Sequence, residues 1–290
     1  MPRVCVIIPT YNWSSVLPYS IRSVLRQTMS DFELRVVGDG CSDDSAEVVS
    51  RIGDPRVIWE NLPQNAGDQA IPNRHAIEQT NCEVVAYLNH DDLYLPHALD
   101  SMLAEIDRGA TCVNGLCFMV NANGRVELGS TRASGYRPGD WMTPSCVMHR
   151  RQAGLDVGGW IPHVECGIIP QESMWDRLVE GGHEFQGSLR LASIKFPAAA
   201  RGNVYRDKPC HEQAVWEQRI LTQDDLEAEL LGRLVAGYTE NPGMSAKKVR
   251  RWLVVGAKTR LGDIRNSILK QNRDTKTLQR WRNFKGLDDS

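Results

Sequence analysis

The chain has 290 residues, of which 41% are hydrophobic, 24% charged and 7% aromatic. This composition is typical of a globular protein with enough apolar material for a sizeable core, and the chain contains no low-complexity tract. The formal net charge of −2 excludes a global positive field that would attract nucleic acid.

The eight cysteines are scattered, with no CxxC pair and no zinc-like spacing. Cys5, Cys82 and Cys112 stand in or beside apolar runs, where cysteine behaves as a small buried hydrophobic residue. This usage predicts a reducing, cytoplasmic environment. Residues 1–3 lead directly into an apolar strand, and no apolar run approaches the roughly 18 residues that span a bilayer. We therefore predict neither a signal peptide nor a membrane span.

Short apolar runs and apolar residues at helical spacing alternate through the first ninety residues. The predicted elements are, in order, a strand over 4–8, a helix over 16–27, a strand over 32–37, a helix over 45–51, a strand over 56–60, a helix over 71–79 and a strand over 84–88. Such alternation predicts a parallel, doubly wound α/β sheet.

The second part of the chain predicts a less regular order of elements. They are a helix over 93–106, a hairpin of strands 111–120 and 125–128 joined at Asn123-Gly124, an irregular stretch over 129–145, a helix over 172–180, strand candidates at Phe185 and over 189–196, and helices from 214 onward with a break at 241–243. Long irregular stretches in compact domains tend to be functional.

An acidic turn, Asn89-His90-Asp91-Asp92, directly follows the apolar run 84–88. Two adjacent carboxylates repel each other unless a cation lies nearby, and hard divalent cations bind carboxylate oxygens together with substrate phosphates. Ligands of open α/β sheets lie beyond the carboxyl ends of the strands, which is where this turn is predicted. The alternative is that Asp91 caps the helix that follows.

Six motifs resemble those of the family-two glycosyltransferases, in the family's order and at its approximate spacing. They are Val6–Asn12, Val36–Asp44, Asn65–Gly67, Leu88–Asp92, Gly158–Trp160 and Gln171–Leu178. The resemblance covers about residues 3 to 180. It implies a GT-A fold, with a Rossmann-like mixed sheet, and an inverting transfer of a sugar from a nucleotide-sugar donor with Mn²⁺ or Mg²⁺ on the diphosphate.

The resemblance also implies a domain plan. Residues 1–212 would form the catalytic domain, with a nucleotide-sugar half over 1–92 and an acceptor half over 93–212, and residues 213–290 a helical, basic extension. By family habit, the acceptor is a saccharide or a lipid-linked sugar in surface polysaccharide synthesis.

For the nucleotide, the resemblance implies a pocket at the ends of the first two strands. Asp39 would accept an N–H of the base, which suits uracil, with thymine left open, so a UDP-sugar is the predicted donor. The alternative is a turn aspartate that bonds its own backbone. The other implied nucleotide-binding residues are Pro9, Thr10, Tyr11, Asn65, Gly67, Arg74, Asn89 and His90. Arg74 could equally be a surface charge, and His90 a packing residue.

For the metal, Asp91 aligns with the residue that binds the ion directly in the family, and His211 is a candidate to complete the ligand shell. For catalysis, Glu172 is the candidate base that removes the acceptor proton, with Asp176 as the fallback. The alternative for Glu172 is a first-turn glutamate favoured by the helix dipole. Asp92 and Trp160 are assigned to the acceptor or sugar.

Three positions depart from the family pattern. The family often has Asp where this chain has Gly38 and Asn89, and an acid where it has Gln171. These departures leave open a catalytically silent nucleotide-sugar binder. A sugar nucleotidyltransferase is a second alternative, but it would need a Gly-rich phosphate loop where this chain has residues 9–13.

The segment 244–285 carries thirteen lysine and arginine residues against two aspartates. It could be an amphipathic helix in peripheral contact with an anionic membrane, or a helical cap packed on the domain. No groove-reading motif accompanies the charge, so nucleic-acid binding is not predicted.

Overall fold

The computed structural model describes residues 1–122, 124, 126–129, 133–198 and 201–240. The strands are β1 (Val4–Thr10), β2 (Phe32–Gly38), β3 (Val57–Asn61), β4 (Val84–Tyr87), β5 (Leu93–Tyr94), β6 (Cys112–Val120), β7 (Val126–Leu128), β8 (Val147–Arg150) and β9 (Phe185–Lys195). The helices are α1 (Leu17–Leu25), α2 (Ser45–Ile52), α3 (Ala70–Gln79), α4 (Ala98–Asp107), the 3₁₀ turn η1 (Pro144–Cys146), α5 (Arg151–Asp156), α6 (His163–Cys166), α7 (Pro170–Glu180), α8 (Val204–Asp207), α9 (His211–Thr222) and α10 (Leu226–Glu240).

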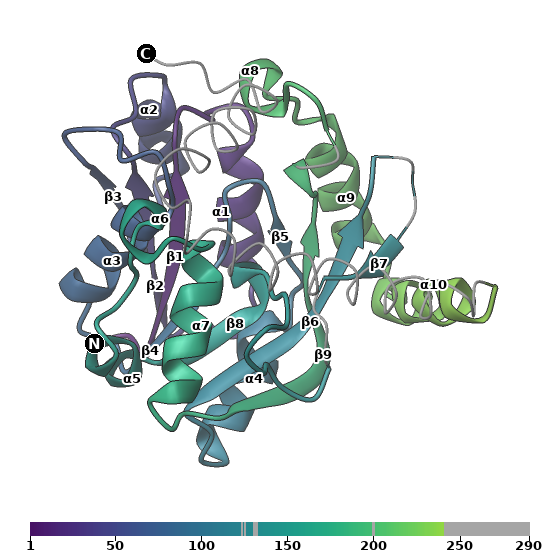
Figure 1. Cartoon of the computed structure of the whole chain (residues 1–290). Coiled ribbons are helices and arrows are strands. Elements are labelled where there is room, and N and C mark those ends of the chain that lie inside the picture. Colours follow the sequence, from purple (N-terminus) through teal and green to yellow (C-terminus); the bar gives the residue numbers. More distant parts are fainter. Residues whose placement is uncertain (123, 125, 130–132, 199–200, 241–290) are drawn as a thin grey trace, which may run out of the picture. The chain divides into compact units, whose positions relative to one another are not determined.

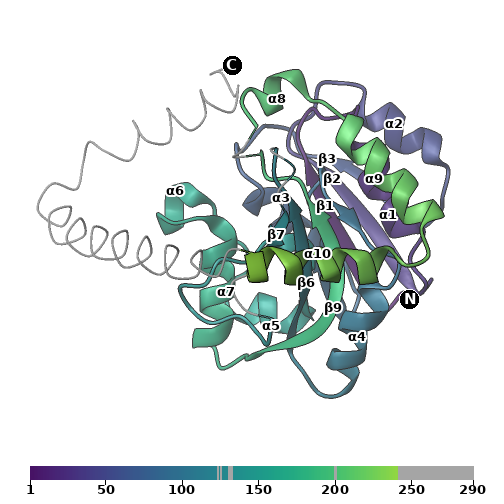
Figure 2. The ribbon, with the colours of Figure 1, turned by 90° about the vertical axis from the view of Figure 1, so that its right-hand side faces the viewer.

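Nine strands of the described chain form one mixed sheet in the order β3-β2-β1-β4-β8-β6-β9-β5, with β7 paired to β6 (Figure 1). The first four neighbours, β3 to β4, are parallel, as the alternation of elements predicts. β8 runs antiparallel to both β4 and β6, which makes the sheet mixed. Helices α1, α2 and α9 cover one face, and α3, α5 and α7 the other (Figure 2).

The centre of the sheet is apolar on both faces. All seven residues of β1 and all four of β4 are buried, because helices cover both sides of these strands. The acidic turn therefore follows the carboxyl end of a strand, β4, that is covered on both faces. This placement confirms the strand predicted over 84–88.

The helix predicted over 93–106 is wrong in its first turn. Leu93 and Tyr94 form the short strand β5, which pairs with β9, and the helix begins only at Ala98. Both side chains are fully buried, and the Tyr94 hydroxyl donates to the Tyr87 carbonyl at 2.7 Å. Pro96 also disfavours a helical conformation in the residue before it. Burial and pairing with a distant strand overrode the local helical pattern.

The predicted hairpin is present as β6 and β7, which pair antiparallel. Of its turn, Asn123 is outside the described residues, as are the break at 241–243 and the basic segment 244–285. No described helix is both long and apolar enough to cross a membrane.

Contacts divide the chain into two compact units. The first comprises residues 1–196 and 208–226, and the second comprises residues 197–207 and 227–290. Every predicted site residue lies in the first unit. The predicted domain boundary after residue 212 stays a prediction.

Candidate functional site

Asp39, at the end of β2, bonds a neighbouring loop and not its own turn. Its carboxylate oxygens accept the backbone N–H groups of Ala66 and Gly67 at 3.0 and 3.1 Å. Burial raises the pKa of this carboxyl, and the two N–H donors oppose that rise. Each carboxylate oxygen can accept a second hydrogen bond, so Asp39 keeps capacity for a base N–H. It also fixes the Asn65–Gly67 loop beside the carboxyl end of β2.

The missing aspartate at position 38 has a steric explanation. A side chain on Gly38 would come within 2.4 Å of Asn61 Oδ1. Asn61 occupies that space and holds the turn by accepting the Cys41 N–H at 2.8 Å and donating to its carbonyl at 2.9 Å. Asn61 thus organises the end of β2, and no side chain can be added at residue 38 without displacing it.

The end of β1 is tied to the same turn. The Asp39 N–H donates to the Thr10 carbonyl at 2.8 Å, and Asn12 Oδ1 accepts the N–H groups of Ser42 and Asp43. Thr10 is buried, whereas Tyr11 is partly exposed. The structure therefore places the predicted residues of the first two strand ends and of the Asn65–Gly67 loop together.

Asp92 is an internal anchor, which corrects its assignment to the acceptor or sugar. Its side chain is fully buried and forms an ion pair with Lys195 Nζ at 3.2 Å. Ser145 Oγ donates to the same carboxylate at 2.5 Å and the Phe196 N–H at 3.2 Å. Burial raises the pKa of Asp92, and the Lys195 ammonium counteracts that rise. The side chain has no exposed surface, and both of its carboxylate oxygens accept donors inside the protein, so it does not face a substrate.

Asn89 serves the same buried cluster. Its Nδ2 donates to Asp92 Oδ2 at 3.1 Å, and its backbone N–H donates to Ser145 Oγ at 3.1 Å. The amide must present its N–H₂ end to a carboxylate, because two acceptor oxygens would repel. An aspartate at position 89 would face Asp92 with a second negative charge. Asn89 therefore departs from the family pattern because the buried cluster needs a hydrogen-bond donor at this position.

His90 packs toward β1. Its Nδ1 donates to the Pro9 carbonyl at 3.2 Å, and its ring lies 4.5 Å, centroid to centroid, from that of Trp13. Burial lowers the pKa of His90, which favours the neutral imidazole. The packing alternative accounts for these contacts, and they also link the acidic turn to the nucleotide side.

Asp91 differs from Asp92 in having a carboxylate without protein partners. Among the described residues, no hydrogen bond or ion pair involves this carboxylate, although the side chain is nearly buried. A carboxylate of this kind fits Mg²⁺ or Mn²⁺, which use one or two carboxylates plus substrate phosphates. Within the described chain, no group of three or more His, Cys, Asp and Glu side chains could hold a metal by itself. The predicted ligand His211 is exposed at the start of α9.

The base candidates lie on α7, whose first turn Pro170 starts. Burial raises the pKa of Glu172, and the charge of Asp176 raises it further. No hydrogen bond in the described chain involves the Glu172 carboxylate. Asp176, in contrast, accepts the Tyr136 hydroxyl at 2.6 Å. A partly buried carboxylate with a raised pKa and no hydrogen bond among the described residues has the properties expected of a general base, so Glu172 stays the candidate.

Gln171 connects α7 to the segment that follows the Asn65–Gly67 loop. Its Oε1 accepts a hydrogen bond from Gln69 Nε2 at 2.8 Å, directly after the Asn65–Gly67 loop. Asp68 Oδ2 likewise accepts the His163 N–H at 2.8 Å. The loop that Asp39 holds is thus bonded to the segment that leads into α7. A second acid at position 171 could not accept from Gln69 without placing another charge beside Glu172.

Trp160 is buried, which argues against stacking on a sugar. Its side chain is fully inaccessible, and its ring packs edge-on against Tyr87 and Trp175 at centroid distances of 5.2 and 5.4 Å. The preceding Gly159 lies near Arg74 and is held through its carbonyl by Arg177 at 2.6 Å. Among the described residues, no hydrogen bond or ion pair involves the guanidinium of Arg74, which leaves it available to a phosphate.

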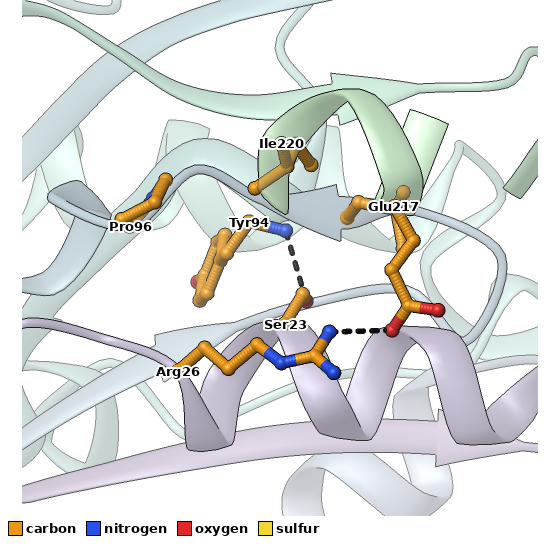
Figure 3. A pocket seen from close by; sticks show the side chains of 7 residues that line it. Ser23, Arg26, Tyr94, Pro96, Glu217 and Ile220 are labelled. Atoms are coloured by element: carbon orange, nitrogen blue, oxygen red, sulfur yellow. Dashed lines mark hydrogen bonds and ion pairs between the residues drawn. The ribbon is translucent and has the colours of Figure 1, made fainter. Parts of the chain in front are cut away.

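A small cavity lies elsewhere, between α1, β5 and α9 (Figure 3). It encloses about 10 Å³, room for one water molecule at most. Its lining includes Ser23, Tyr94 and Glu217, none of which belongs to the predicted site. This cavity is too small for a nucleotide sugar.

Several residues of the site gave no recognisable signal in the sequence. They are Asn61, Gln69, Tyr136, Ser145, Lys195 and Gln213. Each lies far along the chain from the group it contacts, so spacing could not reveal it. Only Lys195 carried a hint, as a charge within an apolar strand.

Comparisons with known proteins agree with this geometry. The family model for glycosyl transferase family 2 matches residues 5–163. A GalNAc(5)-diNAcBac-PP-undecaprenol beta-1,3-glucosyltransferase of Campylobacter jejuni is 32% identical over 122 residues, which are 41% of this chain and 39% of that protein. The matched segments span about a third of the length of such curated relatives.

Solved structures share the fold. TarS 1–349 of S. aureus, in complex with UDP-GlcNAc, has a TM-score of 0.59 at 17% identity and covers 80% of this chain and 70% of its own. The mannosyltransferase PcManGT from Pyrobaculum calidifontis, in complex with GDP-Man and Mn²⁺, has a TM-score of 0.54 at 15% identity and covers 90% and 81%. At such identities the likeness shows the fold alone, and it confirms the predicted GT-A architecture.

Proposed function

Because the chain belongs to glycosyl transferase family 2, we propose that it transfers a sugar, with inversion, from a nucleotide-diphosphate sugar to a hydroxyl of a saccharide or lipid-linked acceptor. The observation that carries the proposal is the contrast between adjacent carboxylates at the end of β4. The Asp92 carboxylate binds Lys195 and other internal donors, whereas the Asp91 carboxylate has no hydrogen bond or ion pair among the described residues. A carboxylate kept free at the carboxyl edge of a covered sheet is suited to a metal–diphosphate ligand.

On the donor side, Asp39 accepts a base N–H, beside Pro9, Thr10 and Tyr11. The proposed donor is a UDP-sugar, because uracil offers one N–H to a carboxylate. Arg74, whose guanidinium has no described partner, pairs with a phosphate. A divalent metal on Asp91, with His211 as a further ligand, would neutralise the departing diphosphate.

On the acceptor side, Glu172 removes the proton from the attacking hydroxyl. Burial and the neighbouring Asp176 raise the pKa of Glu172, which makes it a stronger base than an exposed glutamate. Asp176, one helical turn away, accepts the Tyr136 hydroxyl at 2.6 Å. Polysaccharide synthesis at the cytoplasmic side of a membrane is the proposed setting, with segment 244–285 as a peripheral contact.

Calorimetric titration with UDP, with and without Mn²⁺ and with GDP as the competitor, tests the donor site. We expect UDP to bind in a metal-dependent manner and Asp91→Asn to lose that dependence. The matched control is Asp100→Asn on α4, which leaves the acidic turn intact. If wild type and Asp91→Asn bind UDP equally well in the presence of Mn²⁺, Asp91 is not the metal ligand. If the protein prefers GDP to UDP, the donor is a GDP-sugar and not a UDP-sugar. Metal-dependent UDP binding without transfer or donor hydrolysis would favour the silent binder.

A further inference from the structure

Gln213 reaches the acidic turn from a distant part of the sequence. It lies in the first turn of α9, is 4% exposed, and donates from Nε2 to the Asp91 carbonyl at 3.0 Å. The contact spans 122 residues of sequence. It holds the peptide group of the residue whose carboxylate is free.

The other end of the Gln213 amide has no partner. Its Oε1 is buried, and no hydrogen bond reaches it in the described part of the chain. Because both ends of one carboxamide are neighbouring atoms, Oε1 also lies beside the acidic turn. Buried acceptors are almost always satisfied in native proteins, by protein groups, water or a ligand. The acidic turn therefore adjoins two acceptors without partners, the Asp91 carboxylate and Gln213 Oε1.

Helix α9 is fixed in place by its own contacts. Glu217, one turn after Gln213, accepts Nε and Nη2 of Arg22 in α1 at 2.6 and 2.8 Å. It also accepts Nη1 of Arg26, the residue directly after α1, at 2.6 Å (Figure 3). Trp216 packs against Phe118 of β6 at a centroid distance of 5.9 Å. The contacts of Trp216 and Glu217, which follow Gln213 on α9, therefore fix this part of the helix within the first unit.

We propose that Gln213 is a positioning residue of the metal and diphosphate site. Its Nε2 holds the Asp91 main chain, and its Oε1 accepts a hydrogen bond from a water molecule on the bound cation. Metal-bound waters are strong donors, and Mg²⁺ and Mn²⁺ sites of this kind keep several of them. The inference rests on the proposed function and adds to it a residue that neither the acidic turn nor the motif spacing indicates.

The first test replaces Gln213 with Met, which keeps the volume and removes both the donor and the acceptor. We expect Mn²⁺-dependent UDP binding, measured by calorimetry, to weaken about 10- to 100-fold, the usual effect of removing a partner that orients a metal ligand. The matched control is Gln218→Met, the same change at an exposed position of α9. Wild-type affinity in Gln213→Met would overturn the inference and leave the proposed function standing.

The second test replaces Gln213 with Glu and measures Mn²⁺ binding without nucleotide by electron paramagnetic resonance of the free ion. A carboxylate that faces the cation raises its affinity above that of the control Gln218→Glu, whereas one that points away does not. Equal affinity in the two variants would overturn the inference even if Gln213→Met did not fold. A wild-type protein that binds UDP without metal dependence would overturn both the inference and the metal part of the proposed function.

Discussion

The acidic turn at 89–92 and the first turns of α7 each present two carboxylates, yet the protein treats them differently. In the acidic turn, Asp92 is fully buried and receives four donors, and it fixes the peptide that carries Asp91. On α7, the Glu172 carboxylate has no hydrogen bond in the described chain, and the Asp176 carboxylate has one, from Tyr136. Each pair leaves one carboxylate, Asp91 or Glu172, without a hydrogen bond among the described residues. Under the proposed function, the neighbour of the metal ligand is fixed by four donors, whereas the neighbour of the base is held by one.

The contrast has a physical reason. A metal ligand gains from rigidity, because its geometry must match the ion before the diphosphate arrives. A general base must exchange a proton, and a carboxylate saturated by internal donors would have its pKa lowered and its basicity lost. The pKa of Glu172 can stay raised because no described residue donates a hydrogen bond to its carboxylate.

The largest expected effect is the loss of turnover when the candidate base Glu172 is replaced. Glu172→Gln removes the proton acceptor, so turnover should fall by about 10²–10⁴. UDP affinity should stay unchanged, because the donor site lies on other elements. Steady-state transfer assays with calorimetry on the same samples measure both quantities. The control is Glu180→Gln at the exposed end of α7. A near-normal rate in Glu172→Gln would transfer the role to Asp176 or another group.

Next in size is damage to the buried ion pair. Lys195→Met leaves the Asp92 charge without its cation and should lower the free energy of unfolding by about 3–5 kcal/mol. Adding Asp92→Asn to the same chain should restore part of the loss, since no charge is then left alone. Chemical denaturation of Lys195→Met, of Asp92→Asn and of the double variant gives the coupling energy. Additive losses would mean that the pair does not act as a unit.

Restoring the family's aspartate should harm the donor side. Asn89→Asp removes the donor to Asp92 and adds a like charge, so stability should drop by about 1–3 kcal/mol. We expect no gain in Mn²⁺-dependent UDP affinity, because the side chain points inward. Asn81→Asp, at an exposed position, controls for the added charge. Tighter metal binding in Asn89→Asp would show that residue 89 faces the ion after all.

The smallest effect concerns the pH profile of the base. The negative charge of Asp176 raises the pKa of Glu172, so Asp176→Asn should lower that pKa. A base works when ionised, and the rise of kcat/KM with pH should therefore begin at lower pH in this variant. Tyr136→Phe keeps the charge of Asp176 and should move the profile less. If the pH profile of Asp176→Asn coincides with that of wild type, the ionisation of Glu172 is not what makes kcat/KM rise with pH.

The departures at 38, 89 and 171 illustrate what spacing cannot convey. From the sequence, each looked like a lost acid and kept the silent-binder alternative open. In the structure, Asn61 fills the space beside Gly38, Asp92 receives the Asn89 amide, and Gln69 bonds Gln171. The partners are 23, 3 and 102 residues away, and the longer separations leave no local pattern.

The sequence by itself determined the parallel core, the acidic turn at the end of β4 and the family, because these depend on short apolar runs and on motifs contiguous in the chain. Tertiary structure decided which carboxylate stays free, why Trp160 is buried, and that Leu93 and Tyr94 form a strand. These outcomes depend on Lys195, Tyr87 and β9, which come to lie beside their partners only when the strands of the sheet have paired. Local sequence sets which groups are available, and burial beside distant partners sets what each can do.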